Sequence, residues 1–217
     1  MNKKIFARLL GDTQNDLTKI NQPYIMETFG VEVDRCETIE QYVEAIEDAC
    51  LHKYFSKSWQ NDMKKWKYSG VQLIDEVNSL KTWSVLDVGC GYNEFKGRID
   101  NLVGIDPYND KADLQISTLE YKTAEKYDVI LCLGSVNFCD RDKIVAEVGR
   151  CVNLLADNGT MFFRVNPGVQ HDKPEADWIE FFAWNVPFII ELAEIYNLKI
   201  LDIRDDTNQR KYFIYRK

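Results

Sequence analysis

The stretch Val85-Leu86-Asp87-Val88-Gly89-Cys90-Gly91 decides how the second half of this sequence folds. An apolar run with a single aspartate predicts a buried strand, and the Gly-x-Gly after it predicts a tight turn. A second apolar run, Leu102–Ile105, ends in Asp106, 15 residues after Gly91. In nucleoside-binding α/β folds the glycine turn passes beside the ligand, and such a carboxylate accepts hydrogen bonds from the ribose hydroxyls. The pair therefore predicts a nucleoside site at the carboxyl ends of two parallel strands.

The glycine pattern also limits the class of nucleoside. A dinucleotide fingerprint has a third glycine where this chain has Glu94, and a carboxylate there would repel a pyrophosphate. The segment has no phosphate-binding lysine, so it is not a P-loop. The same carboxylate favours a cationic ligand, such as a nucleoside that carries a sulfonium and an amino acid. Glu94 thus argues against a nicotinamide oxidoreductase.

Outward from this motif, short apolar runs alternate with helical segments, which predicts an α/β sheet. Further strands are expected at 127–133, 160–165, 198–203 and 212–215, with 113–116 as another candidate. A polar turn separates the last two strands, so they should form an antiparallel hairpin. One helix is expected to begin at Asp140, and another to run from Trp178 to Tyr196 with a break or kink at Pro187.

The first 80 residues have a different, helical pattern. Thr38 and Gln41 resemble a capping box ahead of an amphipathic helix, and a second helix is expected near 71–80. Between them, residues 53–68 mix lysines with aromatics, which fits a lid, a nucleic-acid contact or packing on the sheet. We therefore predict a helical N-terminal extension or lid at 1–80 and a core domain at 81–217.

Composition restricts the partners and the compartment. The chain has 217 residues, 27 basic and 35 acidic, and this net charge of −8 argues against binding to duplex nucleic acid. The N-terminus does not resemble a signal peptide, and no apolar run approaches the roughly 20 residues that span a bilayer. A cytoplasmic protein without a membrane segment is expected. Six cysteines without a Cys-x-x-Cys pair predict buried thiols and no metal site.

The motif from Val85 to Gly91 resembles the first motif of the class I, seven-stranded methyltransferases that use S-adenosylmethionine. The resemblance covers about residues 70–217 and includes Asp106, the run 127–135 as the fourth strand, and the turn 154–160. The final hairpin is similar to the family's antiparallel sixth and seventh strands. The resemblance implies a mostly parallel, Rossmann-like sheet and S-adenosylmethionine as the cofactor.

The resemblance also implies which residues contact the cofactor. They are Asp87, Gly89, Cys90, Gly91, Asp106, Pro107, Tyr108, Ser117, Leu133, Gly134 and Ser135. The glycine backbone would approach the methionine part, and Asp87 would orient the loop or bind the ammonium group. Asp106 would take the ribose diol, and Pro107 with Tyr108 would flank the adenine. Ser117 stands near a position where the family often has an aspartate for the adenine amino group.

The chain departs from the family pattern in its first crossovers. Only 10 residues, 92–101, join the first two strands, and about seven, 107–113, precede the next candidate strand. A helical crossover usually takes about a dozen residues or more. We therefore expect a short or missing first helix, no regular second helix, and one trimmed edge of the sheet. Small phage-encoded methyltransferase-like proteins are similar in this respect.

The sequence contains fewer signals for the methyl acceptor than for the cofactor site. After the fourth strand the chain reads Gly134-Ser135-Val136-Asn137-Phe138, without the Pro-Pro of the DNA amino-methyltransferases. Cys132 and Cys139 also lack the proline context of a nucleophilic cysteine. DNA base methylation is therefore disfavoured, and a small molecule or a protein side chain is the expected substrate.

Candidate acceptor-site residues follow the fourth and fifth strands: Ser135, Asn137, Phe138, Arg164, Asn166 and His171. His171 has the ordinary pKa range of a base but is also consistent with a solvated loop residue. Arg164 would either clamp an anionic substrate or pair with a buried acid. The rival to an active methyltransferase is a catalytically degenerate cofactor-binding or scaffold protein, because no base is identifiable.

Overall fold

The protein was analysed as a computed structural model, which describes residues 1–13, 16–32, 36–59 and 62–217. The chain divides into two compact units, Met1–Trp59 with Gln170–Glu180, and Gln60–Val169 with Phe181–Lys217. We call them the helical unit and the sheet unit. Residues 60–80 thus belong to the sheet unit. The segment Gln170–Glu180, which follows β4 in the sequence, belongs to the helical unit. The boundary near residue 81 and the lid role stay predictions.

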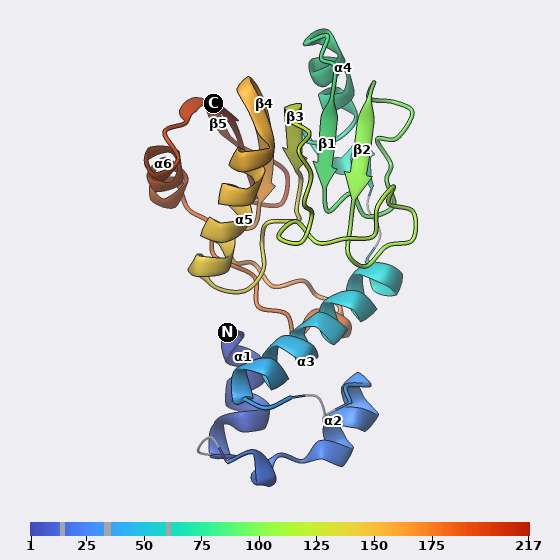
Figure 1. Cartoon of the computed structure of the whole chain (residues 1–217), viewed down its shortest axis with the longest axis vertical. Coiled ribbons are helices and arrows are strands. Elements are labelled where there is room, and N and C mark those ends of the chain that lie inside the picture. The colour runs from blue at the N-terminus through green and yellow to red at the C-terminus, as the bar shows by residue number, and fades with distance from the viewer. Residues whose placement is uncertain (14–15, 33–35, 60–61) are drawn as a thin grey trace. The chain divides into compact units, whose positions relative to one another are not determined.

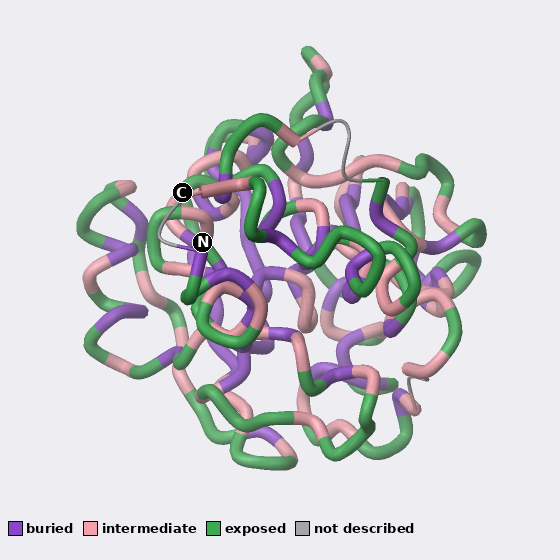
Figure 2. Tube along the Cα trace, turned by 90° about the horizontal axis from the view of Figure 1, so that it is seen from below, coloured by how far each residue is buried: buried purple, intermediate pink, exposed green. Residues whose placement is uncertain are grey.

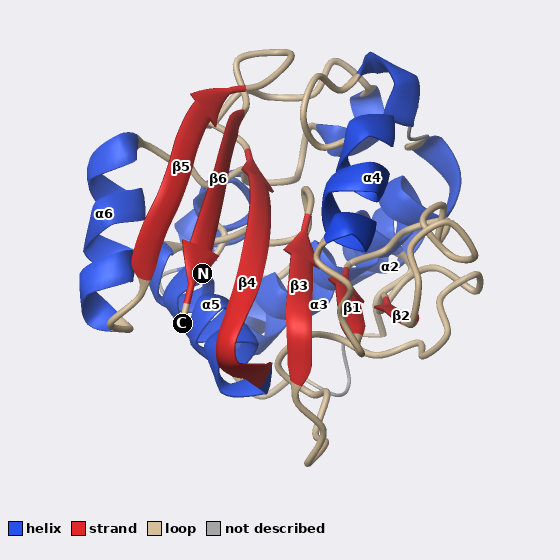
Figure 3. Cartoon of the chain, turned by 90° about the horizontal axis from the view of Figure 1, so that it is seen from above, coloured by secondary structure: helices blue, strands red, loops and turns tan. Residues whose placement is uncertain are grey.

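The sheet unit contains one six-stranded sheet with the order β2-β1-β3-β4-β6-β5 (Figures 1 and 3). The strands are β1 Val85–Val88, β2 Leu102–Ile105, β3 Tyr127–Cys132, β4 Leu155–Val165, β5 Lys199–Asp205 and β6 Lys211–Arg216. The first four strands are parallel, and β6 pairs antiparallel with both β4 and β5. The predicted mostly parallel sheet with a C-terminal antiparallel hairpin is therefore confirmed.

Alternate strand residues fill two hydrophobic layers, one on each face of the sheet. Leu86, Ile130 and Phe163 belong to the layer that also contains α5, Arg141–Leu154, and α6, Val186–Ile195. Val85 and Phe162 belong to the opposite layer, with α4, Val71–Ser79, and the short helix η6, Met63–Lys65. Burial along the trace is shown in Figure 2. Because both faces are covered, the parallel strands read as continuous apolar runs.

The expected trimming of one edge is confirmed. No helix joins β1 to β2, and none lies between β2 and β3. Beyond β2 the candidate strand at 113–116 is reduced to one parallel bridge, Ile105 with Leu114. In this fold the missing strand would lie next to β2, so β2 is the sheet's edge.

The predicted helix from Trp178 to Tyr196 is wrong in its first half. Residues Phe181 and Ala183 instead form isolated bridges with Phe138 and Pro167. The helix α6 starts at Val186, where Asn185 accepts the backbone N–H of Phe188 at 2.9 Å. Pro187 occupies the first turn, where its missing N–H breaks no intrahelical bond. The proline therefore begins the helix and does not kink it.

The helical unit has short helices and one long one. They are α1 Lys3–Ile5, η1 Phe6–Leu10, η2 Gly11–Thr13, η3 Leu17–Lys19, α2 Gln22–Phe29, α3 Ile39–Lys53, η5 Tyr54–Ser58 and η7 Pro174–Ala176. The predicted capping box of α3, Thr38 with Gln41, is present. The Asn2 amide ties this unit together, because it donates to Glu47 and to the carbonyl of Trp178. Among the described residues, no helix is both long and apolar enough to cross a membrane.

Candidate cofactor site

The glycine turn after β1 lies where sequence analysis expects a ligand to approach backbone. Gly89 and Gly91 have φ of +66° and +55°, in the left-handed region that favours glycine. A Cβ added at Gly89 would lie 2.3 Å from the Cβ of Ser135, which follows β3. The N–H groups of Gly89 and Cys90 both donate to the carbonyl of Ile105. The turn is thus packed against the ends of β2 and β3.

A Gly89→Ala variant is expected to cost about 3 kcal/mol or more in free energy of unfolding, against about 1–2 kcal/mol for Gly97→Ala. Both glycines are left-handed, but a Cβ at Gly97 would meet nothing within 4 Å. The difference isolates the contact with Ser135. Urea denaturation of both variants measures it, and adding Ser135→Gly to Gly89→Ala should recover part of the loss. Equal costs for the two alanines would contradict this packing.

Asp106 joins the glycine turn to the loop after β2. Its side chain is 7% exposed. Its Oδ2 accepts the N–H of Gly91 at 3.0 Å, and its Oδ1 accepts those of Tyr108 and Asn109 at 2.8 and 2.9 Å. A carboxylate has about four acceptor positions, so about one remains, on Oδ2. Asp106 therefore holds two loops in place and retains one position for a donor on a ligand.

Asp87 is a buried carboxylate at the same end of the sheet. It is 3% exposed, and no hydrogen bond from a described residue contributes to the pKa of its carboxyl group. Burial, and then the charge of Asp106, raise the pKa of Asp87 to about 7. A buried carboxylate without a donor is unfavourable unless it binds a proton or a cation. The two aspartates together therefore favour a cationic ligand.

The segment after β3 lies directly beside the glycine turn. Gly134 is left-handed with φ +116°, and Leu133 and Ser135 are half-buried. The Ser135 Oγ is buried and has no hydrogen-bond partner among the described residues. Its hydrogen-bonding capacity beside the glycine turn is therefore unused.

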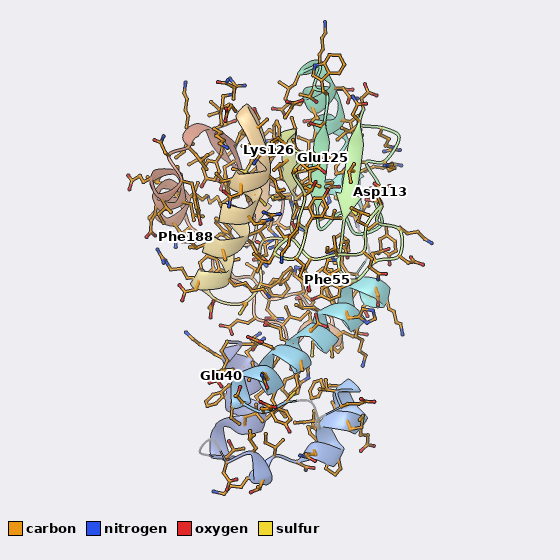
Figure 4. The ribbon with its side chains drawn as sticks, viewed as in Figure 1. Glu40, Phe55, Asp113, Glu125, Lys126 and Phe188 are labelled. Atoms are coloured by element: carbon orange, nitrogen blue, oxygen red, sulfur yellow. The ribbon has the colours of Figure 1, made fainter. Side chains whose placement is uncertain are left out.

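The sequence analysis missed a set of side-chain hydrogen bonds beside β2. They stand where the fold would otherwise have a helix between β1 and β2 and a further strand next to β2. The Asp113 carboxylate accepts the N–H of Gly104 in β2 at 2.8 Å and the ammonium of Lys96 at 2.8 Å. Asn93, directly after the glycine turn, donates to the carbonyl of Lys111 at 3.0 Å. A Cβ at Gly104 would lie 2.5 Å from Asn93 Oδ1, so the glycine in β2 makes room for this side chain. Figure 4 shows Asp113 beside β2.

The remaining predicted adenine-side residues lie in the loops after β2. Pro107 and Tyr108 directly follow Asp106 and are half-buried. The Ser117 hydroxyl donates to Glu120 at 2.5 Å, so it is already engaged within its own turn. The family often has an aspartate near this position for the adenine amino group. This chain instead has a serine that is hydrogen-bonded to a glutamate. These adenine contacts stay predictions.

The candidate acceptor residues Asn137 and Asn166 make structural hydrogen bonds. Asn137 Oδ1 accepts the N–H of Asn166 at 2.7 Å, and Asn166 Oδ1 accepts those of Gly168 and Val169. Both asparagines are at most 3% exposed. They hold together the loops after β3 and β4. Phe138 adds a ring contact with Phe181, with centroids 5.5 Å apart.

Arg164 and His171 each have a partner within their own unit. Arg164 pairs with the buried Asp206 at 3.3 Å and lies over the ring of Trp66 at 3.8 Å. Of its two expected roles, the structure shows pairing with a buried acid. His171 belongs to the helical unit, where its Nδ1 lies 2.7 Å from the Tyr54 hydroxyl. The predicted acceptor-site role of these two residues stays a prediction.

The strand order, the antiparallel β6 and the glycine turn after β1 define a class I, Rossmann-like methyltransferase fold. Many solved S-adenosylmethionine-dependent methyltransferases share this fold. One is the CcbJ methyltransferase from Streptomyces caelestis, with a TM-score of 0.56, 12% identity, and coverage of 76% of this chain and 95% of that one. No protein-family model matches the sequence, and no curated protein matches it.

Two further similar structures hold S-adenosylhomocysteine. The 1,6-didemethyltoxoflavin-N1-methyltransferase from Burkholderia thailandensis has a TM-score of 0.54 and 14% identity, covering 68% of this chain and 77% of that one. The N-methyltransferase NodS from Bradyrhizobium japonicum has a TM-score of 0.52 and 14% identity, covering 77% and 96%. At these identities the similarity establishes the fold.

Proposed function

We propose that this protein is an S-adenosylmethionine-dependent methyltransferase that acts on a small molecule or a protein side chain. The observation that carries the proposal is the pair of buried aspartates beside the glycine turn. Asp87 has no internal donor, and Asp106 retains about one acceptor position. A cationic nucleoside fits both, with its ammonium near Asp87 and a ribose hydroxyl on Asp106.

The other site residues would orient the cofactor. The backbone of Gly89 and Gly91 allows close approach, and the orphaned Ser135 hydroxyl offers a hydrogen bond. When bound, S-adenosylmethionine would supply an electrophilic methyl group on its sulfonium. A small-molecule acceptor is supported by the similar toxoflavin enzyme, whose structure contains its small-molecule substrate.

Calorimetry with S-adenosylhomocysteine tests cofactor binding directly. We expect a dissociation constant in the micromolar range, weaker binding of adenosine, and none of NAD. At a ligand concentration of about 100 times the dissociation constant, the ligand should add about 2.7 kcal/mol to the free energy of unfolding. No heat and no thermal shift at millimolar ligand would overturn the proposal.

A second candidate function is a degenerate cofactor-binding scaffold. It is favoured because Asn137, Asn166 and Arg164 are used in internal bonds, and neither an amide nor a protonated guanidinium can serve as a general base. Radiolabelled methyl transfer to fractionated proteins, nucleic acids and metabolites distinguishes the two. Transfer to a protein or metabolite fraction supports the enzyme, and binding without transfer to any fraction supports the scaffold.

A further inference from the structure

The helical unit contains a cleft of its own, of about 590 Å³. It is bordered by the end of α2, the C-terminal half of α3 and the segment from Pro174 to Trp178. Clefts that hold small molecules commonly measure about 300–1,000 Å³. None of the residues that line it belongs to the nucleoside site of the sheet unit.

One wall of the cleft is a fixed aromatic ring. Trp178 meets Phe29 edge to face, with centroids 5.2 Å apart at 88°. The guanidinium of Arg8 lies 5.0 Å from the Trp178 ring centroid and pairs with Asp177 at 2.7 Å. The Trp178 carbonyl also accepts the amide of Asn2. The ring is thus held before a ligand arrives, which lowers the entropic cost of packing against it.

The α3 side of the cleft has an apolar part between the charged or polar side chains of Asp48, His52 and Lys53. It includes Ala49 and Cys50, and Cys50 is 6% exposed. Burial and the nearby Glu47 raise the pKa of Cys50 to about 12, so the thiol stays neutral at pH 7. A neutral sulfur is a soft, apolar surface. Together with the indole of Trp178 in the same lining, it favours an apolar group on the ligand.

The rim of the cleft carries two lysines and two acids. Lys53 and Lys57 are exposed and form no ion pair within 4 Å among the described residues. The rim acids are Asp48 and Glu175. The pKa of Glu175 is lowered by a hydrogen bond with its own backbone, by Ser58, and by Lys173 as well as Lys53. With Lys173 also acting on Glu175, three lysines stand against the two acids, and this surplus of one positive charge favours an anion.

We propose that this cleft binds a small aromatic molecule bearing a carboxylate, with its ring against Trp178 and its carboxylate at Lys53 and Lys57. The aromatic wall supplies apolar contact, and the lysines supply charge and orientation. The proposal goes beyond cofactor binding and is independent of it, since the cleft shares no residue with the glycine-turn site.

Three indoles that share the ring and a two-carbon side chain, and end in an anionic, a neutral or a cationic group, test the proposal on the full chain. They are indole-3-acetate, the neutral tryptophol and the cationic tryptamine. Nitrogen-15 spectra resolve the indole N–H signals of the five tryptophans, and Trp178→Phe assigns that of Trp178. We expect indole-3-acetate to shift the Trp178 signal saturably with a dissociation constant below about 1 mM. Tryptophol should bind more weakly, and tryptamine at least tenfold more weakly.

Charge reversal provides the matched comparison. The double variant Lys53→Glu with Lys57→Glu should bind indole-3-acetate at least tenfold more weakly than the native chain does. This variant should bind tryptamine more tightly than indole-3-acetate. Lys122→Glu with Lys199→Glu changes net charge equally at exposed positions of the sheet unit and should leave the preference unchanged. Failure of indole-3-acetate to saturate the Trp178 signal by about 5 mM, or an unaltered preference in the first variant, would overturn the proposal. S-adenosylhomocysteine binding, measured separately, distinguishes this failure from failure of the proposed function.

Discussion

An Asp106→Ala variant is expected to bind S-adenosylhomocysteine about a hundredfold more weakly than the native chain. A hydrogen bond to a charged group contributes about 1.5–3 kcal/mol, or roughly one to two orders of magnitude in affinity. The substitution also frees the N–H of Gly91, which Asp106 holds at 3.0 Å, so the glycine turn loses an anchor. Calorimetry measures the affinity, and urea denaturation gives the accompanying loss of stability.

Asp128 provides a matched control for this loss. It too accepts two backbone N–H groups, from Trp83 at 2.8 Å and Ser84 at 3.2 Å, but at the amino end of β3. Asp128→Ala should therefore cost stability in the same way while leaving S-adenosylhomocysteine affinity within about twofold. If both variants bind S-adenosylhomocysteine equally well, Asp106 has only a structural role.

An Asp87→Asn variant is expected to gain stability relative to the native chain as pH rises from 5 to 8. Burial and Asp106 raise the pKa of Asp87 from 3.8 to about 7, so the folded state keeps a proton that the unfolded chain releases. Native stability therefore falls with rising pH across this window and levels off above about pH 7. With about 1.4 kcal/mol for each tenfold change, the full fall is about 2–4 kcal/mol. Urea denaturation at both pH values measures the difference.

Asp113 titrates in the opposite sense and serves as the control. Burial alone would raise the pKa of Asp113, but the N–H of Gly104 and the ammonium of Lys96 outweigh it and lower the pKa. Its contribution to stability is present above about pH 4 and is lost only in stronger acid. Asp113→Asn should therefore cost the same at pH 5 and pH 8. A pH-independent effect of Asp87→Asn would show that its carboxylate is ionised in the folded state throughout.

Ligand binding should remove much of the pH dependence that Asp87 causes. An ammonium group near Asp87 favours the ionised carboxylate, so binding below pH 7 should release a proton. Calorimetry in buffers of different ionisation enthalpy counts that proton, and the count should fall to near zero in Asp87→Asn. A count that does not change between the two proteins would place the cationic group of the ligand elsewhere.

The apolar runs of the sequence, and the turn residues between them, predicted most of the sheet. The strands are buried on both faces, so each appears as an apolar run bounded by glycine, proline or polar turns. The lengths of residues 92–101 and 107–113 predicted the trimmed edge, because neither segment is long enough for a helical crossover. The error at residues 178–185 has a local cause: aromatic spacing resembled a helix, whereas tertiary bridges hold Phe181 and Ala183 extended.

The candidate cofactor site was also predicted only in part from the sequence. The sequence by itself determined the glycine turn and the carboxylate of Asp106, since both follow strands directly and strand ends meet at one edge. Only the tertiary structure decided that Asp87 has no hydrogen-bond donor and that Arg164 forms an ion pair with Asp206. It also decided that the side chain of Asn93 donates a hydrogen bond to the loop after β2. These facts depend on side chains from segments distant in the sequence, and a local pattern contains no information about which of them meet.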